Sequence, residues 1–305
     1  HWILKPTDPK LLEIFRSFRY PLVGHGLAES SIIVQDVLGS FLGSGYITLM
    51  RYSTRIVQAI AGLLLGSVMQ VTLPRVSQHA TDLKALRRTL LESSKLLSII
   101  GFPVCIWLIF AAEPMVVLFF ERGEFSRADA TLTGTIIGLM VPYILLSRIV
   151  SLAQTPFYAT MEMRPPVMST LIFALTHIVL ATLLVSLLGL FGLPIALSLA
   201  MLCSACYMIY KLQSRFGPVG WSEMRGFAFR LSATSTVAGV GFALGTSLVR
   251  MITASGWVAK LLDFSVPTFF AICAFVVSAF VFRLIDGRFL LQGGWSRSFF
   301  LGRRF

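Results

Sequence analysis

The sequence predicts an all-α integral membrane protein with eight transmembrane helices. Of its 305 residues, 56% are hydrophobic and only 13% are charged, whereas about a quarter of the residues are charged in a typical soluble domain. The mean hydropathy is +0.80. Apolar runs recur along nearly the whole chain, each near the roughly 20 residues that a helix needs to cross a bilayer. Lysine and arginine gather in alternate loops between these runs, which is typical of a multi-pass membrane protein.

Eight apolar runs, separated by polar residues, glycine and proline, mark the predicted spans. They cover residues 20–43, 46–74, 91–112, 129–152, 166–188, 193–211, 226–249 and 262–284. The segment between the third and fourth spans predicts a short interfacial helix followed by a turn at Gly123. Three prolines between the fourth and fifth spans separate those two helices, because proline lacks the N–H that an internal helical turn needs.

The basic residues predict how the spans are oriented. Nineteen of the 26 lysines and arginines are assigned to one side of the predicted spans, with Arg148 counted in the link after the fourth span, and four to the other side. Arg51, Arg55 and Arg230 are assigned to the spans themselves. Because cytoplasmic loops carry the excess of positive charge, both ends of this segment are predicted to be cytoplasmic. The net charge of +12 is therefore assigned to membrane orientation, and no nucleic-acid partner is predicted.

The chain begins with "HWILKPTDPKLLEIFRSF", which contains no signal peptide. These residues predict an amphipathic lead-in over 1–19 that joins something upstream. We therefore expect the chain to be the C-terminal part of a longer protein.

Two arginines lie one helical turn apart near the start of the second span. The first two spans are joined by "GSG" at 43–45, so they are expected to form a hairpin in which depth can be compared at about 1.5 Å per residue. Arg51 and Arg55 then lie about 8 and 14 Å below the outer end, Asp36 about 10 Å and Glu29 about 21 Å. Asp36 is thus predicted to be level with the two arginines, and Glu29 deeper.

Two interpretations of these charges remain open from the residues alone. In the first, Asp36 neutralises one arginine and the pair is structural. In the second, Arg51 and Arg55 face an aqueous cavity and bind an anion, while Asp36 orients their side chains. Charges at membrane depth usually face a bundle interior or a cavity, and guanidinium groups suit phosphate oxygens.

Other polar residues within the spans have simpler interpretations. Arg230 lies near a span end and can extend to the interface, and His177 is expected to be a hydrogen-bonded interior histidine. Glu29 and His25 are candidates for a proton or ion relay. The cysteines of "CSAC" at 203–206 are expected to be small buried residues, because no redox or metal-site context surrounds them.

The sequence contains no catalytic or cofactor-binding motif. It has no phosphate-binding glycine loop, no metal-ligand spacing and no nucleophile beside a plausible base. Transport is therefore predicted rather than enzymatic catalysis, with no metal or cofactor.

Three stretches in order resemble the MurJ (MviN) lipid II flippase family. They are "GSGYITLMRYSTRIVQAIAGLLLGSVMQVTLPRVS", "FFERGEF" at 119–125 and "PFYATMEMRPPV" at 156–167, which is similar to the family's "F-Y-A-x-x-D-x-R-T-P-V". The order and spacing of spans agree over about 10–215. The resemblance implies the multidrug/oligosaccharidyl-lipid/polysaccharide exporter fold, which has two six-helix lobes around a cavity and two further helices.

On this resemblance, the chain would divide into three parts. Residues 1–19 would be the cytoplasmic lead-in, 20–215 the second six-span lobe, and 216–305 the two additional spans with a basic cytoplasmic tail. The first lobe would be missing. The resemblance also implies a bacterial inner-membrane location, with membrane lipid and lipid II as partners.

The resemblance implies a site as well. Arg55 matches a cavity arginine thought to hold the lipid-linked pyrophosphate, with Arg51 beside it, Asp36 as charge partner and Glu29 as a possible relay. The last two spans match a pair proposed to take the polyprenyl tail. Thr54 stands where the family commonly has Asp, and Glu162 replaces the Asp of the link.

The resulting prediction is a lipid II flippase that works by alternating access. The alternatives are a flippase for another polyprenyl-linked polysaccharide unit, a cation-coupled small-molecule exporter of the same superfamily, and a membrane scaffold without transport activity. The exporter should depend on Glu29 or Asp36 more than on Arg55.

Overall fold

The computed structural model describes residues 24, 26, 29–43, 45–78, 82–218, 221–251 and 256–282. A helical segment over 29–40 comes first. It is followed by α2 (Tyr46–Gln78), α3 (Leu83–Phe120), α4 (Arg127–Ala159), α5 (Arg164–Leu188), the short 3-10 helix η1 (Gly189–Phe191), α6 (Gly192–Phe216), α7 (Trp221–Val249) and α8 (Gly256–Val281). The predicted lead-in, the basic tail and His25 lie outside the described residues.

The predicted all-α membrane architecture is confirmed. Each predicted span falls on a helix, although the first span is described chiefly from residue 29 onward. Five helical stretches within the described ranges are long and apolar enough to cross a membrane: Leu83–Phe120, Arg127–Ala159, Arg164–Phe216, Gly226–Val249 and Gly256–Val281. The third of these contains both α5 and α6, so the five stretches hold six of the predicted spans. The protein is therefore a multi-pass membrane protein.

The predicted interfacial helix after the third span is wrong. α3 continues without interruption through Pro114 to Phe120. Proline removes one backbone hydrogen bond, but Met115, Val116 and Val117 are buried in the core and hold the last turns in place. The predicted turn at Gly123 is present, where a positive φ of 59° suits glycine.

Side chains define where two of the long helices begin. The carboxylate of Asp82 accepts hydrogen bonds from the backbone N–H groups of Lys84 and Ala85 at the start of α3. At the start of α4, Ser126 and Asp129 form a reciprocal capping box. Such caps satisfy N–H groups that have no partner within the helix.

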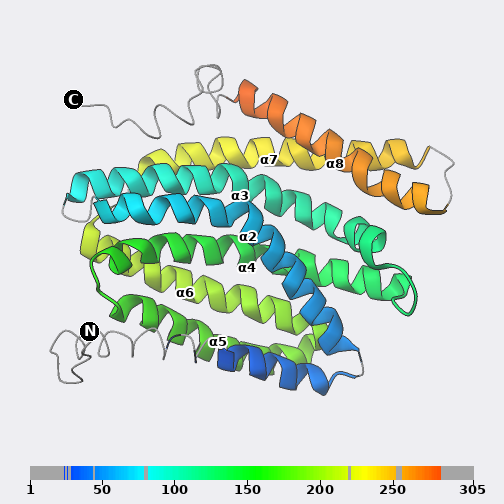
Figure 1. Ribbon diagram of the computed structural model, residues 1–305, viewed down its shortest axis with the longest axis horizontal. Coiled ribbons are helices and arrows are strands. Elements are labelled where there is room, and N and C mark those ends of the chain that lie inside the picture. Colours follow the sequence, from blue (N-terminus) through cyan, green and yellow to red (C-terminus); the bar gives the residue numbers. More distant parts are fainter. Residues whose placement is uncertain are drawn as a thin grey trace, which may run out of the picture.

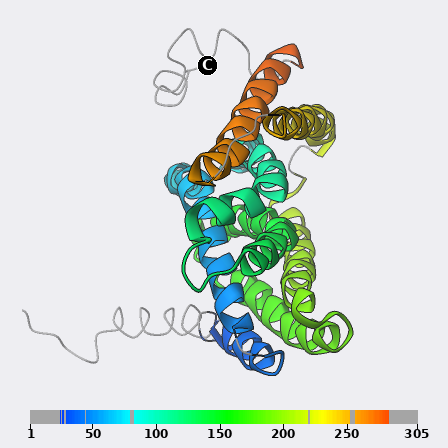
Figure 2. The same cartoon turned by 90° about the vertical axis from the view of Figure 1, so that its right-hand side faces the viewer.

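α4 occupies the middle of the bundle and packs against α2, α3 and α6 (Figure 1). α5 and α6 form one hairpin, which contacts α4 mainly through α6. α7 and α8 form another hairpin, which contacts α3. Figure 2 shows the α7–α8 hairpin on one side of the remaining helices. The largest fully buried side chains of α4 include Ile136, Ile137 and Met140, so the core is centred on this helix.

Very close helix contacts occur where glycine replaces a side chain. A Cβ atom built on Gly134 of α4 would lie 2.7 Å from the Cα atom of Glu113 on α3. One on Gly245 of α7 would lie 2.6 Å from the Cα atom of Pro267 on α8. Small residues allow membrane helices to approach this closely, because dispersion contacts rather than hydrophobic exclusion drive their association.

Ion pairs join α8 to the end of the α3–α4 hairpin. Lys260 lies 3.4 Å from a carboxylate oxygen of Glu121 and donates to the Glu121 carbonyl at 3.3 Å. The same carboxylate lies 3.3 Å from a guanidinium nitrogen of Arg127. At the opposite end, Glu162 in the α4–α5 link accepts three hydrogen bonds from Arg215 of α6, at 2.7, 2.9 and 3.3 Å. The carboxylate raises the pKa of Arg215 through this bonding and through its charge.

Candidate functional site

The hairpin formed by 29–40 and α2 brings Asp36 and Arg51 together. Gly43 and Gly45 have φ values of 129° and 92°, which only glycine adopts readily, and they allow the chain to reverse within a few residues. A terminal guanidinium nitrogen of Arg51 lies 2.7 Å from one carboxylate oxygen of Asp36. The Nε atom of Arg51 donates to the other oxygen at 3.5 Å. The pair is therefore two-pronged, with Asp36 the less exposed partner.

One face of α2 is attached to the core through Ser53. Its hydroxyl donates to the carbonyl of Leu49 at 2.9 Å and lies 3.4 Å from the carbonyl of Thr133 on α4. Arg51 and Arg55 lie two residues before and after Ser53, which places both about 160° around the helix from it. Both arginines therefore face away from the core, and both are exposed.

Arg55 differs from Arg51 in its contacts with the described part of the chain. It forms no ion pair and no hydrogen bond with any residue that the structure describes. Glu29 is exposed, and no bond joins it to either arginine. Because Glu29 is seven residues from Asp36, the two share a helix face but lie about 10 Å apart along the axis. The structure thus joins Asp36 with Arg51, and it shows no side-chain bond from Arg55 or Glu29 to any other described residue.

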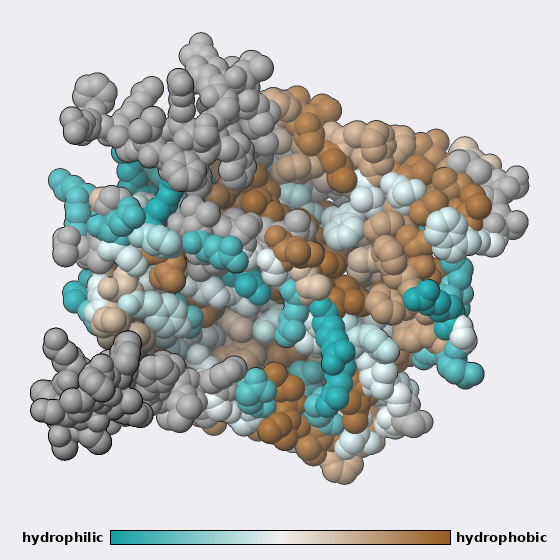
Figure 3. All heavy atoms as spheres, in the orientation of Figure 1, coloured by the Kyte–Doolittle hydropathy of each residue, from teal (hydrophilic) through white to brown (hydrophobic). Residues whose placement is uncertain are grey.

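The polar face of α2 is open in the described part of the chain. Figure 3 shows hydrophilic side chains over the first half of α2, bordered by apolar and mixed surface. Unpaired charge of this kind at membrane depth is costly unless it faces water, a ligand or another protein surface.

The structure also places the other polar residues that the sequence analysis singled out within the predicted spans. His177 is fully buried, its Nδ1 atom is hydrogen-bonded to the hydroxyl of Ser31, and its ring stacks on Phe173. Arg230 is exposed on α7. Cys203 and Cys206 are free and exposed, so the expectation that they are buried is wrong: α6 presents both to its outer face. Within the described ranges, no group of three His, Cys, Asp or Glu residues could hold a metal ion.

Sequence reasoning missed the position of Arg148. It was counted with the basic residues of the link after the fourth span, but it lies eleven residues before the end of α4. Its Nε atom is buried and has no hydrogen-bond partner. The available signal was the apolar run 129–152, which includes this position.

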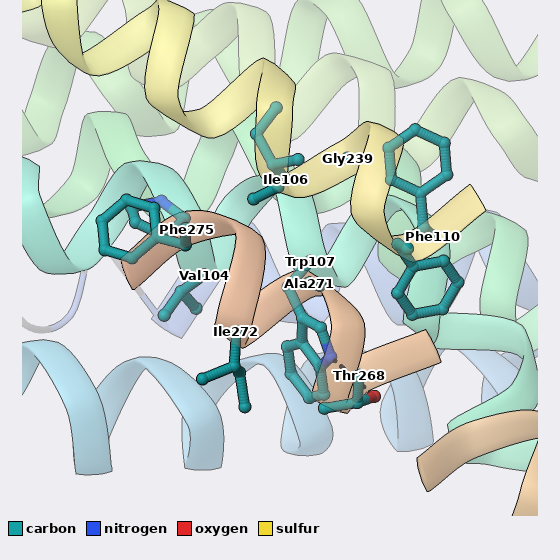
Figure 4. A pocket seen from close by; sticks show the side chains of 12 residues that line it. Val104, Ile106, Trp107, Phe110, Gly239, Thr268, Ala271, Ile272 and Phe275 are labelled. Atoms are coloured by element: carbon teal, nitrogen blue, oxygen red, sulfur yellow. Dashed lines mark hydrogen bonds between the residues drawn. The ribbon is translucent and has the colours of Figure 1, made fainter. Parts of the chain in front are cut away.

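An apolar pocket of about 250 Å³ lies between α3 and the α7–α8 hairpin, which also contact each other directly. Its wall includes Trp107 and Phe110 of α3, Phe242 of α7, and Thr268 and Phe275 of α8 (Figure 4). The indole N–H of Trp107 donates to the hydroxyl of Thr268 at 3.1 Å, while the ring of Phe110 stacks on Phe242. The remaining wall is almost entirely hydrocarbon, which suits an apolar chain.

Comparison with known proteins identifies the family. A family model described as lipid II flippase MurJ matches residues 2–277. The chain belongs to the MurJ lipid II flippase family. The probable lipid II flippase MurJ of Bdellovibrio bacteriovorus is 24% identical over 276 residues, which are 90% of this chain and 52% of that protein. That of Vibrio cholerae is 24% identical over 196 residues, 63% of this chain and 37% of that protein.

Solved structures share the MurJ fold. A lipid II flippase MurJ in an inward closed conformation superposes with a TM-score of 0.71 at 20% identity, covering 93% of this chain and 56% of that one. A multidrug resistance MATE family transporter of the MOP superfamily, in an outward-facing conformation, gives 0.57 at 15% identity, covering 91% and 66%. The MurJ-family chain thus spans about half the length of the MurJ proteins that it resembles.

The Trp107–Thr268 hydrogen bond is expected to contribute modestly to docking of the α7–α8 hairpin. Trp107→Phe and Thr268→Val should each lower the melting temperature in detergent, and the double variant should lose less than the sum. The expected coupling is about 0.6 kcal/mol, the average for such bonds between membrane helices. Thr268→Val combined with Phe275→Leu is the control, in which the effects should add. Additivity in the Trp107 cycle would contradict the assignment.

Proposed function

We propose that this chain forms the second lobe and the two additional helices of a lipid II flippase in the bacterial inner membrane. The observation that carries the proposal is the open face of α2, where Arg55 has no partner among the described residues and Arg51 is held by Asp36. Two guanidinium groups one turn apart match the two phosphates of a lipid-linked pyrophosphate in charge and hydrogen-bonding capacity. The family assignment supports lipid II as the lipid that carries it.

The open face of α2 also supports the proposal that another part of the protein, a first lobe, packs against it. In this proposal, a first lobe covers this face and the space between the lobes is the substrate cavity. The segment 29–40 and helices α2 to α6 are then the described part of the second lobe, which was predicted over 20–215. Helices α7 and α8 are the additional pair. The proposed division is consistent with packing of α7 and α8 chiefly against α3.

Transport would proceed by alternating access, with both ends of this segment in the cytoplasm. The cavity takes the pyrophosphate head group from the inner leaflet, while the pocket between α3 and α7–α8 holds part of the polyprenyl chain. Rocking of the lobes then exposes the head group outside. An inside-negative potential favours return of an empty cationic cavity, by about 2.3 kcal/mol per charge moved across 100 mV. No bond is broken, so the proposed activity is transport and not catalysis.

Glu29 favours a second candidate, a cation-coupled exporter of small molecules. It is an exposed acidic residue on the same helix face as Asp36. In such an exporter, Glu29→Gln should abolish transport and Arg55→Ala should be tolerated. In the flippase the order of sensitivity is reversed.

Complementation tests the proposed function directly. Cells depleted of their own lipid II flippase receive this chain alone, or this chain together with the N-terminal half of the Bdellovibrio bacteriovorus relative. We expect growth and outward appearance of lipid II with the pair, and neither with the chain alone. Failure of the pair despite membrane insertion of both parts would refute the proposal. Rescue by the chain alone would refute the need for a first lobe.

A further inference from the structure

Arg148 interrupts a buried stripe of α4. The stripe follows helical spacing through Ile137, Val141, Ile144, Arg148 and Leu152, and the four apolar members are buried. Arg148 is half-buried and lies about 16 Å from the end of the helix. Its side chain therefore begins on the packed side of α4, within the membrane-spanning part.

The Arg148 side chain has an unsatisfied nitrogen among the residues that the structure describes. Its Nε atom is buried without a hydrogen bond. In the described part of the chain, no carboxylate forms an ion pair with it. Burial of the Nε atom without a counter-charge among the described residues has a desolvation cost that a bound anion would offset.

The contact between Thr133 of α4 and Ser53 of α2 gives the depth of Arg148 relative to the arginines of α2, which lie on the opposite face of α2 from Ser53. Thr133, four residues before Ile137 on α4, has its carbonyl 3.4 Å from the hydroxyl of Ser53, which lies between Arg51 and Arg55 in the sequence. Arg148 is fifteen residues further along α4, about 22 Å along the helix axis. The distance is most of the roughly 30 Å thickness of the hydrocarbon core.

We propose that Arg148 is a second anion-binding residue, which binds the pyrophosphate of the lipid substrate at the inner part of the transport path. The inference rests on the proposed flippase function. Arg148 receives the head group near the inner leaflet, and Arg55 and Arg51 hold it near the outer leaflet. Two cationic positions divide the electrostatic free-energy barrier for moving a highly charged group across the hydrocarbon layer into two smaller steps.

Binding of short prenyl ligands to the purified full chain in nanodiscs tests the proposal. Farnesyl pyrophosphate is the probe, and farnesol is its uncharged counterpart. Arg148→Gln should weaken farnesyl pyrophosphate binding about tenfold or more, as expected for loss of a charged hydrogen-bonding group, and leave farnesol unchanged. Arg148→Lys should lie between. Arg230→Gln, on the exposed face of α7, is the matched control and should bind like the parent.

A second measurement needs no substitution. Phenylglyoxal modifies accessible arginines, and mass spectrometry locates the modified residue. Farnesyl pyrophosphate should protect Arg148 from modification, and farnesol should not. Equal modification with and without farnesyl pyrophosphate would overturn the proposal, because it would mean that Arg148 only extends toward interfacial water. This measurement decides the matter if Arg148→Gln does not fold.

Arg55→Gln in the same binding assay separates this inference from the proposed function. Weak binding in Arg55→Gln with normal binding in Arg148→Gln would overturn the role of Arg148 and leave the flippase site intact. The reverse result would support an anion site at Arg148 and overturn the one at Arg55. Normal binding in both variants would overturn both.

Discussion

Replacement of Arg55 by alanine is expected to lower lipid II flipping by about ten- to a hundredfold, the range for loss of a charged hydrogen-bonding partner. The side chain is exposed and has no partner among the described residues, so its removal leaves no buried acid unpaired. The substitution should therefore change binding without changing the fold. The measurement is the rate at which lipid II becomes accessible outside proteoliposomes that hold this chain with its first lobe.

Two further variants show whether the charge or the fork of donors matters at this position. Arg55→Lys should retain part of the activity, because an ammonium keeps the charge and loses the planar pair of donors. Arg230→Ala serves as the control for loss of an exposed arginine and should flip at the parental rate. Full activity in Arg55→Ala would remove the pyrophosphate clamp from the mechanism.

Replacement of Gly134 by alanine is expected to destabilise the protein by about 1–3 kcal/mol, the usual cost of overpacking. The new Cβ atom would lie 2.7 Å from the Cα atom of Glu113, and neither backbone can move without separating α3 from α4. The melting temperature in detergent, read from loss of the monodisperse peak on gel filtration, measures the effect.

Gly138, one turn further along α4, provides the matched control. A Cβ atom there would meet nothing within 4 Å. Gly138→Ala should therefore leave stability unchanged or raise it by up to about 1 kcal/mol, because alanine is the better helix former. Equal losses in the two variants would mean that the α3–α4 contact does not limit stability.

The helices were predictable because membrane helices follow a simple physical rule. Backbone groups in hydrocarbon must bond within their own segment, so an apolar run of sufficient length becomes a helix. The error at Pro114 has a physical cause as well. Proline predicts a break from local chemistry, but burial of Met115 to Val117 in the core outweighs one lost backbone bond.

The candidate site was predictable only in part. The "GSG" turn is so short that depth along one helix sets depth along the next, and Asp36 and Arg51 are accordingly adjacent. The role of Arg55 as a pyrophosphate ligand stays a prediction. Arg148 was misplaced because Lys/Arg counting treats a residue near a span end as part of the loop, whereas α4 continues eleven residues beyond it.

The sequence by itself determined the class of protein, the order of the helices that the structure describes and the common depth of Asp36 and the two arginines, because hydrophobic length and a tight turn act locally. Only the tertiary structure decided which arginines have partners, where α3 ends and where a pocket opens between α3 and the α7–α8 hairpin. These properties depend on contacts between helices far apart in the chain. No spacing within one helix records those contacts.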